Sequence, residues 1–173
     1  METVKIKKFA LIVLTACLLL SLTACGGENS PIKKGDKYRD FTAALTDGGT
    51  FRLSDHKGKV ILLNFWATWC GPCVGEMPAF SRLVEAYGDK LALVAVNCGE
   101  DEAAVSAFLA KNGYTFPVAL DPEGEIGQLY PSDGIPYTVI IAPDGTVSDI
   151  QTGAGDAETM FVHYSGMLDR ALQ

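Results

Sequence analysis

The sequence is poor in residues that hold metal ions. It contains two histidines, His56 and His163, which stand far apart, one in a loop segment and one beside an apolar stripe. One Cys-x-x-Cys motif is present at residues 70–73, but a second such motif and a His-x-x-x-His pair are both absent. A tetrahedral zinc site needs two such pairs. We therefore predict no metal site and no cofactor, and we assign neither histidine a role.

Positive charge is also scarce. The 173 residues include 14 Lys and Arg against 21 Asp and Glu. Residues 1–24 hold three of the basic residues and one of the acidic ones, so the chain from residue 25 onward carries 11 basic and 20 acidic residues, a net charge of −9. No basic patch is visible in this part. The composition argues against binding of nucleic acid and of anionic lipid headgroups.

Hydrophobic runs long enough to span a membrane are absent as well. The apolar stretch at residues 9–22 follows three lysines and leads into Leu22-Thr23-Ala24-Cys25. It is too short and wrongly flanked for a spanning helix, and it indicates a secretory signal peptide that ends in a lipobox. We predict a signal peptide at residues 1–24 and a lipid on Cys25 that anchors the chain. An ordinary signal peptide cut nearby is the alternative, and both place the domain outside the cytoplasm.

The rest of the chain predicts a short tether and one domain. Residues 25–35 are mostly small and polar and form the lipidated tether, and residues 36–173 are apolar enough for a single core. Hydrophobic patterns predict strands at residues 60–65, 91–97 and 116–120, hairpins around residues 47–49 and 143–145, and helices after residue 70, around 105–109, at 125–130 and from 156. This order predicts an α/β fold, a mixed central sheet with helices on both sides.

The Cys70-Gly71-Pro72-Cys73 motif follows directly on the first of these strands. A helical pattern begins after it, so Cys70 should lie at a helix N-terminus, where the thiol pKa falls below its ordinary value of about 8.5. The thiolate attacks disulfides, and Cys73, one turn further along, is placed to resolve the mixed disulfide. We favour a redox-active disulfide over half of a zinc site or a purely structural bridge.

These residues carry a family resemblance. Trp66-Ala67-Thr68-Trp69-Cys70-Gly71-Pro72-Cys73 closely resembles the active-site segment of the thioredoxin superfamily. The flanking Asn64-Phe65-Trp66 and Glu76-Met77-Pro78 resemble its TlpA/ResA-like branch of extracytoplasmic thiol–disulfide oxidoreductases, here in a lipoprotein form. The resemblance runs from about Gly35 to the C-terminus. It implies a thioredoxin-like fold with an N-terminal β-hairpin and a central insert, and substrate contacts from Trp69, Gly71 and Pro72. Trp66 either walls the site or belongs to the core.

Ile135-Pro136 resembles the cis-proline loop that faces the Cys-x-x-Cys motif in this superfamily. The resemblance implies that Ile135 and Pro136 bind substrate, with the backbone edge of Ile135 pairing with an extended substrate segment. A plain proline at the start of a strand is the alternative.

Glu76 is the predicted proton acceptor for Cys73. Cytoplasmic thioredoxins carry a buried aspartate where this chain has Asn64, and an amide cannot titrate. Glu76 lies three residues after Cys73 on the same side of the helix, and it matches the acidic residue of ResA-like proteins. Partial desolvation would raise its pKa and let it exchange a proton with Cys73. A solvated helix carboxylate is the alternative.

Two further cysteines remain. Cys17 leaves with the signal peptide, and Cys98 ends the apolar run at residues 91–97. We favour a buried, inert thiol at Cys98 over a third redox centre.

The resulting hypothesis is a monomeric, lipid-anchored thiol–disulfide oxidoreductase on the outer face of the cytoplasmic membrane. It would reduce disulfides in exported proteins. The resemblance implies an integral-membrane thiol reductase as electron donor and suggests apocytochrome c as a substrate. The first rival is a peroxiredoxin-like peroxidase, whose usual Pro-x-x-x-Thr-x-x-Cys pattern does not fit Ala67-Thr68-Trp69-Cys70. The second is a non-catalytic lipoprotein with a structural disulfide.

Overall fold

The computed structural model describes residues 30–173. The predicted signal peptide, Cys17 and the predicted lipidation site Cys25 lie outside the described residues. The compact unit spans Pro31–Gln173 and so begins before the predicted boundary at residue 36. The reason is Ile32, which is 4% exposed and packs in the core. No helix in residues 30–173 is long and apolar enough to cross a membrane.

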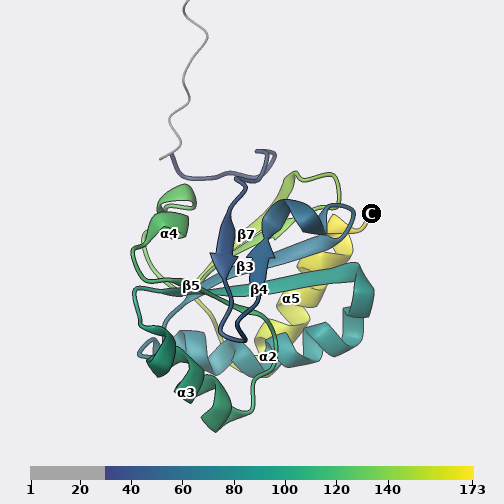
Figure 1. Ribbon diagram of the computed structural model, residues 1–173. Helices are drawn as coiled ribbons and strands as arrows, with labels where there is room; N and C mark the ends of the chain where they lie inside the picture. Colours follow the sequence, from purple (N-terminus) through teal and green to yellow (C-terminus); the bar gives the residue numbers. More distant parts are fainter. Residues whose placement is uncertain (1–29) are drawn as a thin grey trace, which may run out of the picture. The chain divides into compact units, whose positions relative to one another are not determined.

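A five-stranded mixed sheet forms the centre of this unit (Figure 1). Its strands, in spatial order, are β5 (Val118–Asp121), β4 (Leu91–Cys98), β3 (Val60–Trp66), β6 (Tyr137–Ile141) and β7 (Val147–Thr152). β3, β4 and β5 run parallel to one another, and β6 and β7 pair antiparallel. β3 and β4 are buried along almost their whole length, as their continuous apolar sequences predict.

β5 begins later than predicted. Pro117 has no backbone N–H to give to the ladder, although its carbonyl accepts the N–H of Ala95 at 3.0 Å. Regular pairing with β4 therefore starts at Val118 rather than at residue 116.

The N-terminal hairpin predicted from the resemblance is confirmed. β1 (Thr42–Ala44) and β2 (Thr50–Arg52) form an antiparallel pair apart from the main sheet. The turn contains Gly48, whose φ of 85° is accessible to glycine at little cost. A 3₁₀ helix, η1 (Leu53–His56), then leads to β3.

Helices cover both faces of the sheet, but unequally. Their bounds are α2 (Gly71–Tyr87), η2 (Gly88–Lys90), α3 (Glu102–Asn112), α4 (Glu125–Leu129) and α5 (Ala157–Ala171). Leu62 and Trp66 of β3 pack in one core cluster with α2, α3 and α5. Leu63 and Phe65, which point to the opposite face, pack in a second cluster with the hairpin and the short α4. Figure 1 shows α4 apart from the three longer helices. The predicted α/β fold is confirmed.

Candidate active site

The two motif cysteines lie where β3 gives way to α2, as predicted. Cys70 is the N-cap residue of α2 and Cys73 lies in its first turn. The Sγ of Cys70 accepts a hydrogen bond from the backbone N–H of Cys73 at 3.2 Å, and the two sulfurs form a disulfide. A helix N-terminus at Cys70 favours negative charge on its sulfur once the disulfide is reduced.

The surface around the disulfide is uneven. Trp69 is 72% exposed, and Gly71 and Pro72 are also exposed. Cys70 retains 6% exposure, whereas Cys73 retains only 1%. A substrate therefore reaches Cys70 first, and Cys73 lies behind it.

The loop before β6 forms the second part of the site. The Ile135–Pro136 peptide bond is cis, which agrees with the resemblance to the cis-proline loop rather than with a plain proline at the start of a strand. β6 pairs with β3 so that Tyr137 lies opposite Phe65, which places Pro136 beside the end of the strand that leads to Cys70. Pro136 is buried, and its carbonyl accepts the backbone N–H of Gly153 at 2.8 Å. Sheet register thus brings the Ile135-Pro136 loop to the same edge as the cysteines.

Glu76 is a buried carboxyl on α2, so the alternative of a solvated helix carboxylate is wrong. Its side chain is 0% exposed. The Nδ2 of Asn64 donates to its Oε1 at 3.0 Å, and the hydroxyl of Tyr164 donates to its Oε2 at 2.7 Å. Burial raises the pKa of Glu76 from 4.5 to about 7, although the hydrogen bonds from Tyr164 and Asn64 oppose this rise.

Thr138 closes a ring of hydrogen bonds around this carboxyl. The Nδ2 of Asn64 also donates to the Oγ1 of Thr138 at 2.9 Å, and that Oγ1 lies 3.0 Å from the hydroxyl of Tyr164. The ring joins β3, α2, β6 and α5, and all four of its side chains are 0% exposed. We name this set, Asn64, Glu76, Thr138 and Tyr164, the carboxyl ring.

Known proteins resemble this chain in sequence and in fold. Residues 33–167 match the Redoxin family. The chain belongs to this family. ResA of Geobacillus kaustophilus, a thiol-disulfide oxidoreductase, is 34% identical to this Redoxin over 166 residues, which cover 91% of the chain and 95% of ResA.

Solved structures agree with the sequence comparison. The thiol:disulfide interchange protein DsbE of Chlorobium tepidum matches this Redoxin with a TM-score of 0.74 and 32% identity, over 82% of the chain and 99% of DsbE. The exposed lipoprotein thioredoxin Etrx1 of Streptococcus pneumoniae matches with a TM-score of 0.65 and 27% identity, over 74% of the chain and 99% of Etrx1. The predicted ResA-like relationship, thioredoxin-like fold and enzyme class are confirmed: this Redoxin is a thiol–disulfide oxidoreductase.

Trp66 and the two histidines contact other side chains of the domain. Trp66 is 0% exposed and packs against Phe108 with ring centroids 5.4 Å apart, so it belongs to the core. His56 stacks on Phe51 at 4.5 Å, and His163 lies 3.0 Å from Gln151 through its ring nitrogen. Residues 30–173 contain no group of three His, Cys, Asp or Glu side chains arranged to hold a metal.

Cys98 is half-buried and free of disulfide bonding. Burial, assisted by the nearby charges of Asp121 and Glu100, raises the pKa of its thiol to about 11. A thiol of this kind stays protonated near neutral pH and reacts slowly. These surroundings agree with an inert thiol rather than a third redox centre.

Glu100 is a residue of the site that the sequence reasoning missed. It follows β4, and its Oε2 accepts the backbone N–H of Thr68 at 2.7 Å and the Nδ2 of Asn97 at 2.8 Å. Burial works against its ionised form, but the hydrogen bonds from Thr68 and Asn97 outweigh it and lower the pKa of Glu100. The carboxylate thereby ties the segment before Cys70 to the end of the neighbouring strand.

Tyr164 and Thr138 were also missed as members of the site. The buried apolar residues of α5 pack in the core, and Tyr164 is one of them. A signal was nevertheless present, because a phenol on a buried stripe needs a hydrogen-bond partner for its hydroxyl.

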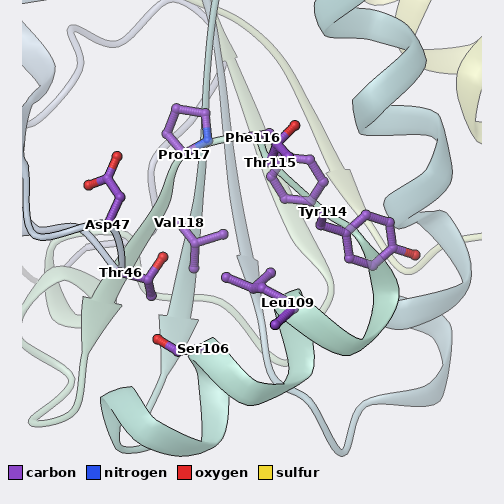
Figure 2. Close-up of a pocket in the computed structure, with 10 residues that line it drawn as sticks. Thr46, Asp47, Ser106, Leu109, Tyr114, Thr115, Phe116, Pro117 and Val118 are labelled. Carbon is purple, nitrogen blue, oxygen red and sulfur yellow. The ribbon is translucent and has the colours of Figure 1, made fainter.

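A surface cavity of about 300 Å³ lies elsewhere on this Redoxin (Figure 2). It is bounded by the hairpin turn at Thr46 and Asp47, by α3 and by the segment leading into β5. None of its lining residues belongs to the predicted site, so the cavity plays no part in the chemistry that follows.

Proposed function

We propose that this Redoxin is a membrane-anchored enzyme that reduces disulfide bonds in exported proteins through the Cys70/Cys73 dithiol. One observation carries the proposal. Cys70 lies at a helix N-terminus and keeps 6% exposure, at the same sheet edge as the Ile135-Pro136 loop, while Cys73 keeps only 1%. This arrangement supports attack by Cys70 and resolution by Cys73.

The reaction is two successive thiol–disulfide exchanges. In the reduced enzyme the Cys70 thiolate attacks one sulfur of the substrate disulfide, a mixed disulfide forms and the first substrate thiol leaves. The Cys73 thiolate then attacks the Sγ of Cys70, the mixed disulfide breaks and the second substrate thiol leaves. The substrate gains two electrons and two protons, and the enzyme keeps the Cys70–Cys73 disulfide.

Glu76 takes the proton of Cys73 in this scheme. Cys73 is 1% exposed, so water has little access to its thiol. Glu76 is three residues further along the same helix face, and a pKa of about 7 suits a group that accepts and releases a proton near neutral pH. We assign Glu76 as the base for the resolving step.

Residues on both sides of the Cys70–Cys73 disulfide bind the substrate. Trp69, Gly71 and Pro72 supply one side, and Ile135 and Pro136 supply the other. A backbone edge before a strand can pair with an extended substrate segment, so that affinity comes from main-chain hydrogen bonds. Beside Ile135 lies a cavity of about 360 Å³, with walls from Phe65, Cys98, Tyr130 and α4. This cavity supports an apolar substrate side chain at that position.

The location rests on residues outside the described part. The lipobox that ends at Cys25 supports a lipid anchor on the outer face of the cytoplasmic membrane. The likeness to Etrx1, an exposed lipoprotein, supports the same location. Because each turnover leaves the enzyme oxidised, a donor of two electrons is required, and we assign an integral-membrane thiol reductase to this role. Apocytochrome c is the proposed substrate, and the enzyme acts as a monomer.

Trapping of substrates tests the proposal. Cys73→Ala keeps the attacking thiol but cannot resolve, so mixed disulfides with exported proteins should accumulate in the membrane fraction. The matched control is the double variant Cys70→Ala/Cys73→Ala, which should trap nothing. Identified partners with paired cysteines that are present only in the single variant would support the proposal. Equal recovery from both variants would refute it, and rapid consumption of hydrogen peroxide by the wild type would favour a peroxidase instead.

Two further measurements address location and direction. Cys25→Ser should release the protein from membranes, and wild-type protein that is soluble with an unmodified N-terminus would contradict the anchor. The Gly71-Pro72 pair resembles that of reducing thioredoxins, whose reduction potential is about −270 mV, whereas that of a strong oxidant is about −120 mV. A glutathione titration should give a value near the reducing end, and a value near the oxidising end would reverse the assignment.

A further inference from the structure

The carboxyl ring has a defined direction of donation. Asn64 uses the two hydrogens of its Nδ2, one for Glu76 and one for Thr138. Tyr164 uses its single hydrogen for the Oε2 of Glu76. The contact between Thr138 and Tyr164 is the exception, because either hydroxyl can donate there. With Tyr164 donating to Glu76, Thr138 donates to Tyr164.

This pattern suits an ionised carboxylate. Both oxygens of Glu76 accept a hydrogen bond, one from the Nδ2 of Asn64 and one from the hydroxyl of Tyr164. A protonated Glu76 needs the reverse at one oxygen, because its new O–H requires an acceptor in a site that excludes water. A buried donor without a partner carries the full desolvation penalty of that group. The hydroxyl of Tyr164 is the one partner of Glu76 that both donates and accepts.

We propose that Tyr164 is a positioning residue for Glu76, whose hydroxyl hydrogen turns from Glu76 to Thr138 when the carboxyl gains a proton. The Oε2–H of Glu76 then donates to the Oη of Tyr164, and Tyr164 donates to the Oγ1 of Thr138. Thr138 gives up its own donation to Tyr164 while it still accepts from Asn64, so the hydrogen without a partner moves from the carboxyl to a hydroxyl that is able to rotate. Asn64 needs no rearrangement. The carboxyl keeps a partner in both protonation states, so it can take the proton of Cys73 and give it back. This inference rests on the proposed role of Glu76.

The groups that face Glu76 are few and come from four elements. They are Asn64 of β3, Thr138 of β6 and Tyr164 of α5, with Cys73 one turn earlier on α2. Tyr164 and, after reduction, Cys73 are the titratable members. Burial, together with the neighbouring Glu76, raises the pKa of Tyr164, so the phenol stays neutral while the carboxyl titrates. Among these groups, the change of charge near neutral pH in the oxidised enzyme therefore belongs to Glu76.

Tyr164→Phe tests the inference. The variant keeps the ring that packs beside Phe80 and removes only the hydroxyl. Loss of one of two hydrogen bonds to the ionised form should move the titration of the Glu76 carboxyl, followed by ¹³C NMR, upward by about one pH unit or more. The pH profile of the resolving step should shift with it. Tyr87→Phe is the matched control, because its hydroxyl also links α2 to α5 but bonds to Ser165 and Asp169. Tyr87→Phe should leave both the titration of the Glu76 carboxyl and the pH profile of the resolving step unchanged.

Thr138 supplies a second test. Thr138→Val removes the group that receives the hydrogen of Tyr164 and should disfavour the protonated carboxyl, which lowers the midpoint of Glu76. Thr138→Ser should restore it. In the wild type, with ¹³C-labelled tyrosine, the ring carbon that bears the hydroxyl of Tyr164 should change its chemical shift at the same midpoint as Glu76. This measurement needs no substitution and so remains decisive if a variant fails to fold.

Two outcomes separate the inference from the proposed function. A Tyr164 signal that is unchanged through the titration of Glu76, or a folded Tyr164→Phe with the wild-type midpoint, would overturn the inference. Glu76→Gln should still slow resolution in that case. If Glu76→Gln instead resolves at the wild-type rate, the proposed role of Glu76 fails, while the coupled midpoints of Tyr164 and Glu76 still report on the ring.

Discussion

Glu76 should make the oxidised enzyme less stable as the pH rises through neutrality. Burial raises its pKa from 4.5 to about 7, so between these values the folded protein holds a proton that the unfolded chain releases. The stabilisation from this group is fully present below pH 4.5 and is lost as the pH rises through about 7. At about 1.4 kcal/mol per pH unit, the loss amounts to roughly 3 kcal/mol. Full burial of the side chain means that solvent screens little of it.

Glu76→Gln removes this dependence. The amide has nearly the same shape, and Tyr164 can still donate to its carbonyl oxygen. The free energy of unfolding, measured with urea and with the Cys70–Cys73 disulfide intact, should fall in the wild type relative to the variant by roughly 3 kcal/mol between pH 4.5 and above 7. The intact disulfide matters because it removes the thiol of Cys73 from the titration.

Two features make the comparison specific. Burial lowers the pKa of His56, which makes stability rise with pH in an overlapping range, but this contribution is common to both proteins and cancels in the difference. Glu85→Gln, at an exposed position of the same helix, is the matched control and should track the wild type. Parallel curves for wild type and Glu76→Gln across the whole range would refute the reasoning, since Glu76 would then be ionised in the folded state as it is in the unfolded chain.

Four other substitutions have expected results. Trp69→Ala should raise KM for a protein disulfide in a steady-state assay while stability stays within about 0.5 kcal/mol, because the side chain is 72% exposed. Glu100→Ala should cost about 1–3 kcal/mol in urea unfolding, because it leaves the N–H of Thr68 without its partner; wild-type stability would contradict this. Asp156→Ala removes the N-cap bond to the N–H of Thr159 and should cost about 1 kcal/mol without changing disulfide exchange. Cys98→Ala should leave the rate of exchange with a small-molecule disulfide unchanged, and slow alkylation of Cys98 near neutral pH in the wild type would agree with its raised pKa; a variant slower toward that small disulfide would reopen a redox role.

Local sequence was sufficient for much of this enzyme. The apolar run of β3 followed by Cys70-Gly71-Pro72-Cys73 predicted the strand, the turn and the helix start, because each is set by neighbouring residues. Hairpin positions followed from glycine-containing turns for the same reason. The Ile135-Pro136 loop was predicted from the resemblance rather than from local physics.

Tertiary structure decided the environment of the carboxyl. Helical spacing placed Glu76 on the same side of α2 as Cys73, but it does not determine whether that side is exposed to solvent. Burial came from Asn64, Thr138 and Tyr164, which arrive from three other elements. Glu100 likewise became part of the site because β4 lies beside β3. A pKa depends on desolvation and on the partners within a few ångströms, and those are set by which elements pack together rather than by the order of residues along any one of them.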